Sequence, residues 1–299
     1  MSNYKQKTPP SQAKKSHKNP RLMLKMQRMG KTMVFADEQD PPDLNPIVVS
    51  NQNKKLYPWP DKYRVMPNEM TRSALFAVVR PGHRKWLEDT VIASRAGTRL
   101  AFTGRQLDQS DCDVWLQALQ LAKHKDLGTR VYFKRGAFLK ALGRQHGGKG
   151  YQWLDRSLKR LFVAAVVIRT KRYQSGFHLI DGYDLDEKTG EYWLRISPDA
   201  KAAFDCDHTS RVDLERRLQI GRGQQLAKWL QNYVCGHAKG NQHTRGLPYL
   251  YEWSGVSGPI RNFRSIGLPR ALKELARLDV ITGGRIRQDG MVTWFRPEA

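Results

Sequence analysis

The sequence predicts an α+β fold of two winged-helix domains in tandem, each made of a helix-turn-helix followed by a β-hairpin, the wing. Three observations predict it. The order helix, helix, helix, hairpin occurs twice along the chain, and this is the element order of a winged-helix domain. The chain has 299 residues, enough for two modest domains. It is also strongly basic, as DNA-binding domains are.

The charge of the chain limits its partners. There are 52 Lys and Arg residues against 28 Asp and Glu, a formal net charge of +24. This favours a polyanionic partner, of which nucleic acid is the commonest and a membrane surface the main competitor. No segment approaches the roughly 20 apolar residues that span a bilayer, and the N-terminus lacks the apolar core of a signal peptide. We therefore expect a cytoplasmic protein that does not bind membranes, and the three widely spaced cysteines fit a reducing compartment.

Residues 1–55 are expected to form a disordered basic arm and a linker. Residues 1–31 contain nine Lys and Arg residues and no acid, with Pro, Ser and Gln in quantity. An acidic, Pro-rich segment follows at residues 37–46 and is predicted to be the linker.

The first winged-helix domain is predicted to cover residues 56–205. A short apolar helix at 73–79 and strands near 90–93 and 100–103 are expected first. Helical periodicity then predicts the three helices of the domain at residues 111–125, 135–142 and 149–162. A strand at 131–133 separates the first two helices, and Gly143 ends the second. The strands expected after the third helix are residues 165–172, 176–183 and 191–196, and the first two of these form the predicted wing.

The second domain is predicted to cover residues 206–299. Its helices are expected at residues 224–235, 247–253 and 260–278. Asp289-Gly290 is a two-residue turn, so strands at 285–287 and 291–295 form the hairpin. Pro269 leaves two alternatives for the third helix. Either one bent helix starts near Ile260, or a loop ends at Leu268 and a new helix begins with Pro269 in its first turn.

The third helix of the first domain carries the residues expected to contact DNA. Its apolar stripe leaves a polar face on the other side, and spacings of three and four place this face in a major groove. The polar face consists of Lys149, Gln152, Arg156, Lys159 and Arg160. Residues 129–172 contain twelve Lys and Arg residues and one acid, whereas an ordinary solvated helix face mixes both signs.

Each of these side chains has an expected role. Gln152 and Arg156 are predicted to contact base edges, because glutamine pairs with adenine and arginine with guanine. Lys159 and Arg160 are predicted to contact phosphates. The residues expected where the wing meets the DNA backbone or the minor groove are Arg169, Lys171 and Arg172. In the second domain the DNA-binding candidates are Arg261, Asn262, Arg264, Ser265, Arg270 and Lys273 on the third helix, with Arg285 and Arg287 on the hairpin.

Three other signals are weighed and set aside. Gly30-Lys31-Thr32 lacks the earlier glycine of a phosphate-binding loop. Two Cys-x-His pairs, at 206–208 and 235–237, are spaced unlike known zinc fingers. No histidine or carboxylate cluster points to metal-assisted chemistry. We expect no metal, no cofactor and no enzymatic activity.

Several segments resemble the TrfA-type plasmid replication initiators. They are Pro58-Trp59-Pro60-Asp61, Arg64, Met66-Pro67-Asn68, Arg72 to Phe76, Phe102-Thr103-Gly104, Asp113-Val114-Trp115, Leu142-Gly143, Gly150-Tyr151 and Leu158 to Leu161. The resemblance is strong over residues 57–170. After Arg211 it is a similarity of pattern, carried best by Gly255, Ser257, Phe263-Arg264 and Glu274-Leu275.

The resemblance implies a function that composition does not give. Such initiators bind tandem repeats called iterons at a plasmid origin through two winged-helix domains, and they help to open an adjacent AT-rich segment. They recruit the initiator DnaA, the helicase DnaB and the sliding clamp; monomers bind iterons, and a homodimer is the inactive form that controls copy number. This chain departs from the family in two places. The nearest match to the clamp motif, residues 31–35, lacks the leading glutamine, and Pro269 interrupts the second recognition helix.

Two other functions remain open from the sequence. A winged-helix transcriptional repressor would bind duplex DNA in the same way without a role in replication. A basic RNA-binding or structural protein would bind without preference for duplex repeats.

Overall fold

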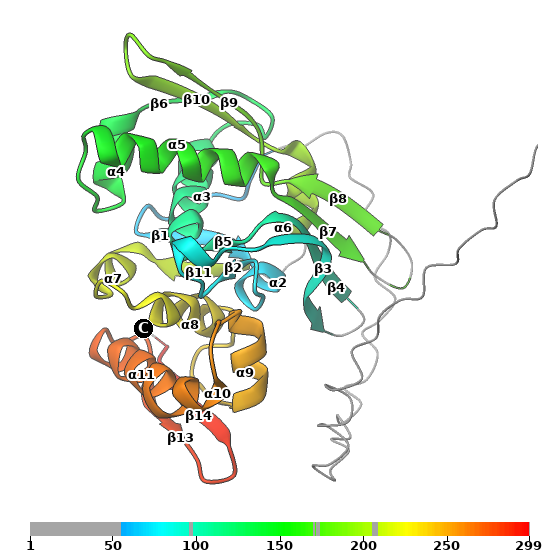
Figure 1. Cartoon of the computed structure of the whole chain (residues 1–299), viewed down its shortest axis with the longest axis vertical. Helices are drawn as coiled ribbons and strands as arrows, with labels where there is room; N and C mark the ends of the chain where they lie inside the picture. Colours follow the sequence, from blue (N-terminus) through cyan, green and yellow to red (C-terminus); the bar gives the residue numbers. More distant parts are fainter. Residues whose placement is uncertain (1–54, 96–97, 170, 172–173, 205–208, 299) are drawn as a thin grey trace, which may run out of the picture. The chain divides into compact units, whose positions relative to one another are not determined.

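The computed structural model describes residues 55–95, 98–169, 171, 174–204 and 209–298, all within one compact unit, Pro41–Ala299. The fold is α+β (Figure 1). Its buried apolar side chains form two clusters. The first cluster runs from Leu56 to Phe204 and the second from Ile220 to Trp294. The predicted arm, apart from Lys55, and the predicted boundary at residue 205 lie outside the described residues, so both stay predictions.

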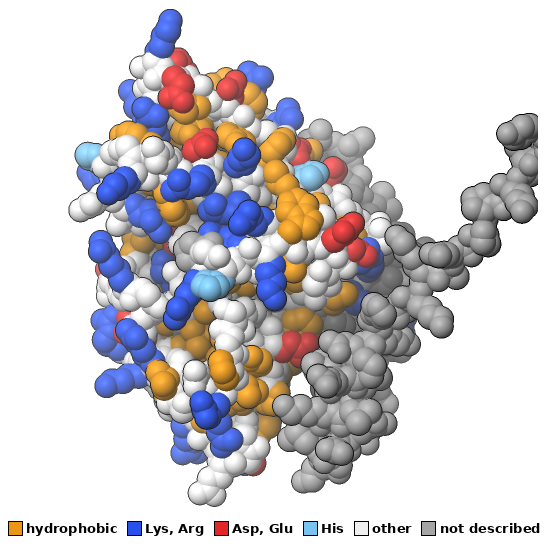
Figure 2. Space-filling view, viewed as in Figure 1, with side chains coloured by type: hydrophobic (Ala, Val, Ile, Leu, Met, Phe, Trp, Pro, Cys, Tyr) orange, Lys and Arg blue, Asp and Glu red, His pale blue; other side chains and the backbone are white. Residues whose placement is uncertain are grey.

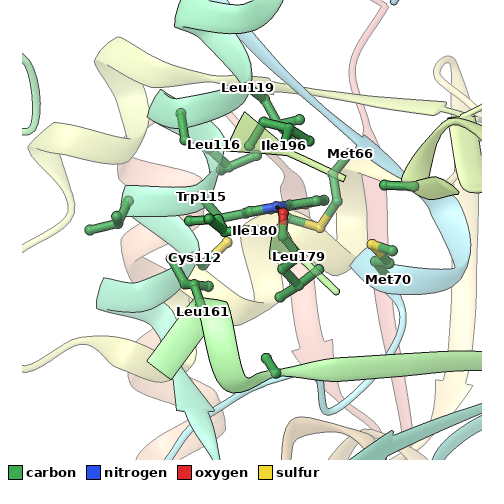
Figure 3. Packing of buried hydrophobic residues seen from close by; sticks show 14 of the residues in the cluster. Met66, Met70, Cys112, Trp115, Leu116, Leu119, Leu161, Leu179, Ile180 and Ile196 are labelled. Atoms are coloured by element: carbon green, nitrogen blue, oxygen red, sulfur yellow. Dashed lines mark hydrogen bonds between the residues drawn. The ribbon is translucent and has the colours of Figure 1, made fainter. Parts of the chain in front are cut away.

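The first winged-helix unit has the predicted order of elements. Its helices are α3 (Gln109–Ala122), α4 (Arg135–Ala141) and α5 (Gly148–Val163). Its strands are β6 (Val131–Lys134), β9 (Ile180–Asp186) and β10 (Glu191–Ile196), which form an antiparallel sheet in the order β6-β10-β9. Trp115 of α3 is fully buried in the core, among side chains that include Leu161 and Ile196 (Figure 3).

The second winged-helix unit repeats this order. Its helices are α8 (Gln225–Cys235), α9 (Leu247–Ser254), α10 (Ile260–Asn262) and α11 (Leu268–Arg277), with a π-helical turn, η3 (Phe263–Gly267), between the last two. Its strands are β12 (Asn241–Gly246), β13 (Thr282–Ile286) and β14 (Met291–Arg296), in the order β12-β14-β13. The strand between the first two helices pairs with the last strand in both units, so the tandem winged-helix prediction is confirmed.

Further elements surround the first unit. They are β1 (Tyr63–Pro67), α2 (Asn68–Thr71), β2 (Phe76–Ala77), η1 (Pro81–His83), β3 (Trp86–Arg95), β4 (Thr98–Arg105), β5 (Leu107–Asp108), β7 (Ala165–Arg169), β8 (Gln174–His178), η2 (Pro198–Ala200), α6 (Lys201–Phe204), β11 (Thr209–Asp213) and α7 (Leu214–Gln219). Strand β1 pairs with β11, β2 with β5, and a four-stranded sheet has the order β3-β4-β7-β8.

Two sequence predictions are wrong. The expected helix at 73–79 is replaced by a turn and the short strand β2, which pairs with β5. The hairpin expected to be the wing of the first domain, β7–β8, instead pairs with β4, with Phe102 opposite Val166. The wing of the first unit is the β9–β10 hairpin, since this is the hairpin that pairs with β6.

Pro269 does not break the third helix of the second unit, which is continuous from Ile260 to Arg277. In a regular α-helix the proline ring would clash with the carbonyl of the fourth residue before it, Ser265. The π-turn η3 accommodates one extra residue at this point, and the N–H of Leu268 bonds to the carbonyl of Phe263, five residues back. Of the two alternatives left open by the sequence, the structure therefore has the single helix that starts at Ile260.

Candidate nucleic-acid interface

The turn between α4 and α5 fixes the start of the first recognition helix. α4 ends at Ala141, and Gly143, two residues later, has a φ of +64° that favours glycine. The N–H of Gly143 donates to the carbonyl of Lys140 at 3.0 Å and the N–H of Arg144 to that of Leu139 at 2.9 Å, the pattern of a Schellman motif. In the first turn of α5, a Cβ on Gly150 would lie 2.6 Å from the carbonyl oxygen of Gln145. The turn therefore requires glycine at both of its ends, at Gly143 and at Gly150.

Four of the five predicted side chains of α5 share one solvent face. Leu154, Ser157, Leu158 and Leu161 face the core. Exposed residues of the opposite side are Lys149, Gln152, Arg156 and Lys159. In the space-filling view Lys and Arg side chains gather over α5 (Figure 2). This face has the composition and the spacing of a helix that lies in a major groove.

Arg160 does not lie on this exposed face, which corrects its predicted placement there; that it contacts phosphate stays a prediction. Its Nη2 donates to Oδ1 of Asp111 at 2.6 Å and its Nε to Oδ2 at 3.1 Å. The hydroxyl of Ser157 donates to the same carboxylate at 2.6 Å. Asp111 is fully buried in α3, so Arg160 and Ser157 fasten the recognition helix to the first helix of the domain.

The wing residues predicted for the first domain are also corrected. Arg169 ends β7 and donates to Asp89 at 2.6 Å and Gln174 at 2.7 Å, in the four-stranded sheet. Lys171 is exposed beyond the same strand, and Arg172 lies outside the described residues. The tip of the wing is the turn between β9 and β10, where Asp186 accepts the N–H of Lys188 at 2.8 Å. The segment 186–190, with Asp at its start and Gly at its end, is the turn signal that could have identified this wing.

The third helix of the second unit presents a second polar face. Its buried side contains Phe263, Leu268, Ala271, Leu272 and Leu275. All six predicted residues are exposed: Arg261, Asn262, Arg264, Ser265, Arg270 and Lys273. The hydroxyl of Ser265 donates to the carbonyl of Arg261 at 2.9 Å, and Ile266, the residue after Ser265, is 65% exposed. On the wing, Arg285 is exposed and Arg287 pairs with Asp289 at 2.8 Å.

One carboxylate stabilises the buried side of this helix. Glu274 accepts hydrogen bonds from Arg277 at 2.9 Å and from the backbone N–H of Gly221 at 2.9 Å. The hydrogen bond from Arg277, followed by that from Gly221, holds the pKa of Glu274 at about 2 although burial opposes this. The carboxylate of Glu274 therefore has a structural role, in which it links the third helix to the segment before α8.

Three arginines near α5 were missed from the sequence. Arg144 lies over the ring of Trp153 at 3.6 Å, Arg135 over that of Tyr151 at 4.2 Å, and Arg130 over that of Trp193 at 4.1 Å. The guanidinium groups of Arg144 and Arg135 therefore stack on aromatic rings of α5 itself. They were missed because each contact joins different elements and leaves no periodic signal in the sequence.

A buried polar junction joins the two winged-helix units. Arg217 of α7 is 1% exposed and donates to Asp113 of α3 and to Asn232 of α8, the latter at 3.1 Å. Lys228 of α8 donates to the second oxygen of Asp113 at 2.6 Å. Burial alone raises the pKa of Asp113, but the charges of Arg217 and Lys228 outweigh it and hold this pKa below its ordinary value. The first helices of both units are thus bonded to the same arginine.

Other features bear on the remaining predictions. Within the described ranges, no group of three or more His, Cys, Asp or Glu residues is placed to hold a metal ion. Cys206 and His208 of the zinc set lie outside these ranges, as do residues 31–35. Among the helices that the structure describes, none is both long and apolar enough to cross a membrane.

Comparison with known proteins places the chain in a family. The model of the family described as TrfA protein matches residues 50–237. The chain belongs to the TrfA family. A curated member from Escherichia coli, plasmid replication initiator protein TrfA, is 29% identical over 190 residues, which is 61% of this chain and 49% of that protein. The chain thus spans about half the length of this TrfA relative.

Solved structures share the fold of this TrfA family member. A crystal structure of domains 2 and 3 of RctB has a TM-score of 0.56 at 14% identity, covering 78% of this chain and 99% of that one. A second structure of the same two domains has a TM-score of 0.51 at 11% identity, covering 77% and 96%. At these identities the similarity supports the fold and nothing further.

Proposed function

We propose that this chain is a plasmid replication initiator that binds repeated sequences in double-stranded DNA at an origin. It would read these iterons with α5 and with the helix at residues 260–277, one in each of two successive major-groove faces. Family membership supports the replicative role, since the curated relative has that function in its name.

One observation carries the DNA-binding part of the proposal. Among the exposed residues of the two recognition helices none is acidic, while Lys and Arg recur along both. A helix surface that serves only solubility mixes both signs. Two such surfaces on successive winged-helix units, in a chain of net charge +24, match a duplex that carries a phosphate about every 1.7 Å of its axis.

The finer parts of the proposal concern partners and chemistry. We propose that the chain acts without catalysis and without a cofactor, using binding energy to deform DNA beside the iterons. DnaA, DnaB and the sliding clamp are its proposed host partners in the bacterial cytoplasm. The monomer would be the DNA-binding form and a homodimer the inactive one.

Replication in trans tests this function. A plasmid with the cognate origin and no initiator gene is introduced into cells that express the chain. We expect the plasmid to be maintained, and to be lost when Gln152, Arg156 and Lys159 are all replaced by Ala. A reporter with the same repeats in its promoter serves as the second readout. Silencing of the reporter without plasmid maintenance would establish a transcriptional repressor instead.

A further inference from the structure

A basic cavity lies between the first unit and the second, away from the residues assigned to the recognition helices. Its volume is about 650 Å³. Six cationic side chains line it, each from a different segment: Lys62, Arg72, Arg211, Arg216, Lys239 and Arg296. Two acids, Asp213 and Asp279, also line it. The wall includes strand β11 and residues at the end of α8, elements that Figure 1 shows in the middle of the described unit.

Among the described residues that line this cavity, cationic side chains outnumber carboxylates by six to two. Within the part of the chain that the structure describes, none of the six cations forms an ion pair with a carboxylate. The carboxylate of Asp213 instead accepts the backbone N–H of Arg216 at 3.0 Å, at the start of α7. Cations gathered around one cavity repel each other, and an anion bound among them removes this repulsion.

Several of these side chains are held in place by backbone carbonyls. Arg216 donates to the carbonyl of Asp279 at 2.8 Å, Lys239 to that of Glu298 at 2.9 Å, and Arg296 to that of Cys235 at 2.8 Å. Hydrogen bonds to carbonyls orient these cations but leave their charge uncompensated. The cavity is therefore lined by positioned cations and does not depend on flexible surface side chains alone.

Arg72 places an unsatisfied donor at the cavity wall. Its Nε is buried and, among the described residues, has no hydrogen-bond acceptor. A Cβ on Gly236 would lie 2.9 Å from this atom, so the guanidinium packs against the backbone of Gly236 at the cavity wall. Buried donors in proteins are nearly always satisfied, so this atom adds an unsatisfied donor to a wall that is already rich in cations.

We propose that this cavity binds the phosphate groups of a nucleotide. Its volume is within the range of about 300–1,000 Å³ that small-molecule sites occupy and exceeds what a single inorganic anion needs. Arginine and lysine are the side chains that recognise phosphate oxygens. The nucleotide is either free in solution, as a nucleoside triphosphate, or a unit of a DNA strand that passes between the two winged-helix units.

The first arm of the test uses free ligands on the full chain. ATP and inorganic tripolyphosphate are titrated calorimetrically into the wild type, Arg211→Gln and the control Arg105→Gln. Arg211 and Arg105 are both exposed strand residues, but only Arg211 lines the cavity. We expect one ATP per chain, bound about tenfold more weakly by Arg211→Gln, the effect of one lost charge-assisted hydrogen bond, and unchanged by Arg105→Gln.

The second arm tests DNA as the source of the phosphate. Binding of a duplex with the origin repeats is measured at several salt concentrations for the same three proteins. If neither ATP nor tripolyphosphate binds, a salt slope lowered by about 0.9 in Arg211→Gln alone places a DNA phosphate in the cavity. No binding of either small anion, together with equal salt slopes in both variants, would overturn the proposal. The preference of the wild type for origin repeats over shuffled DNA is read in the same assay, so failure of the proposed function is recognised separately.

Discussion

At the scale of single residues, two arginines of α5 lie in opposite environments. Arg156 is exposed on the polar face, whereas Arg160, one turn later, is bonded to buried Asp111. The sequence places both on one face, because side chains four residues apart on a helix point in nearly the same direction. What separates them is a carboxylate on another helix, which only the tertiary structure provides.

Replacing Arg156 with Ala tests base reading. We expect a loss of about 1–3 kcal/mol in binding to the origin repeats and a relaxed preference at one base pair. The free energy of unfolding should change by less than about 0.5 kcal/mol because the side chain is exposed. Arg160→Ala is the control, with a loss of about 1.5–3 kcal/mol in stability, since it removes hydrogen bonds to a charged group. Equal weakening by Arg156→Ala on origin and random duplexes would rule out contact with a base.

The lowered pKa of Glu274 leads us to expect a specific dependence of stability on pH. Its pKa is about 2 in the folded chain and about 4.5 in the unfolded chain, so the folded state favours the ionised form. The stabilisation is complete above pH 4.5 and is lost as the pH falls from there towards 2. We expect Glu274→Gln to be less stable than the wild type at pH 6, with the difference shrinking by pH 3. The urea midpoint at both pH values measures this, and a constant difference would contradict the assignment.

At the scale of elements, the sequence located most helices of both winged-helix units. The three helices of each unit were predicted close to their observed ranges, because buried side chains such as Leu154, Leu158 and Leu161 recur at helical spacing. The wing of the first unit was misplaced because β7, β8 and β9 are all consecutive strands, and which of them pairs with β6 is not encoded locally. β1 and β11 were missed for the same reason, since 142 residues separate Pro67 from its partner Thr209.

The glycines at the start of α5 offer a matched pair of variants. A Cβ on Gly150 would meet the carbonyl oxygen of Gln145 at 2.6 Å, while one on Gly148 would have nothing within 4 Å. We expect Gly150→Ala to lower the free energy of unfolding by about 1–3 kcal/mol, as overpacking does. Gly148→Ala should change it by less than about 0.5 kcal/mol or raise it. Chemical denaturation measures both, and equal effects would show that the turn can adjust.

At the scale of the whole molecule, the junction at Arg217 connects the two winged-helix units. It joins α3, α7 and α8 through hydrogen bonds made by one buried guanidinium. Trp229 of α8 adds a hydrogen bond from its indole N–H to the carbonyl of Ser73 at 3.0 Å. None of these contacts was predicted from the sequence, in which Arg217 is one of three arginines within seven residues and nothing distinguishes it.

Breaking this junction should cost far more than removing a surface arginine. Arg217→Met removes one of the two cations that are bonded to the buried carboxylate of Asp113. We therefore expect a loss of about 3–5 kcal/mol in the free energy of unfolding. The control Arg222→Met, at an exposed position, should change it by less than about 0.5 kcal/mol. Urea denaturation of the two variants decides the matter, and similar small losses would mean that the junction contributes little to stability.

The central claim is that two recognition helices give this chain sequence-specific binding to duplex DNA. The most direct measurement is the affinity for a duplex with the origin repeats and for a shuffled duplex, each at two salt concentrations. We predict a preference of about 10³-fold or more that persists at the higher salt, and a smaller preference when Arg156 and Arg264 are both replaced by Ala. Equal binding of both duplexes, with an affinity that falls steeply as salt rises, would contradict the claim. The net charge of +24 would then serve only to bind phosphates without regard to sequence.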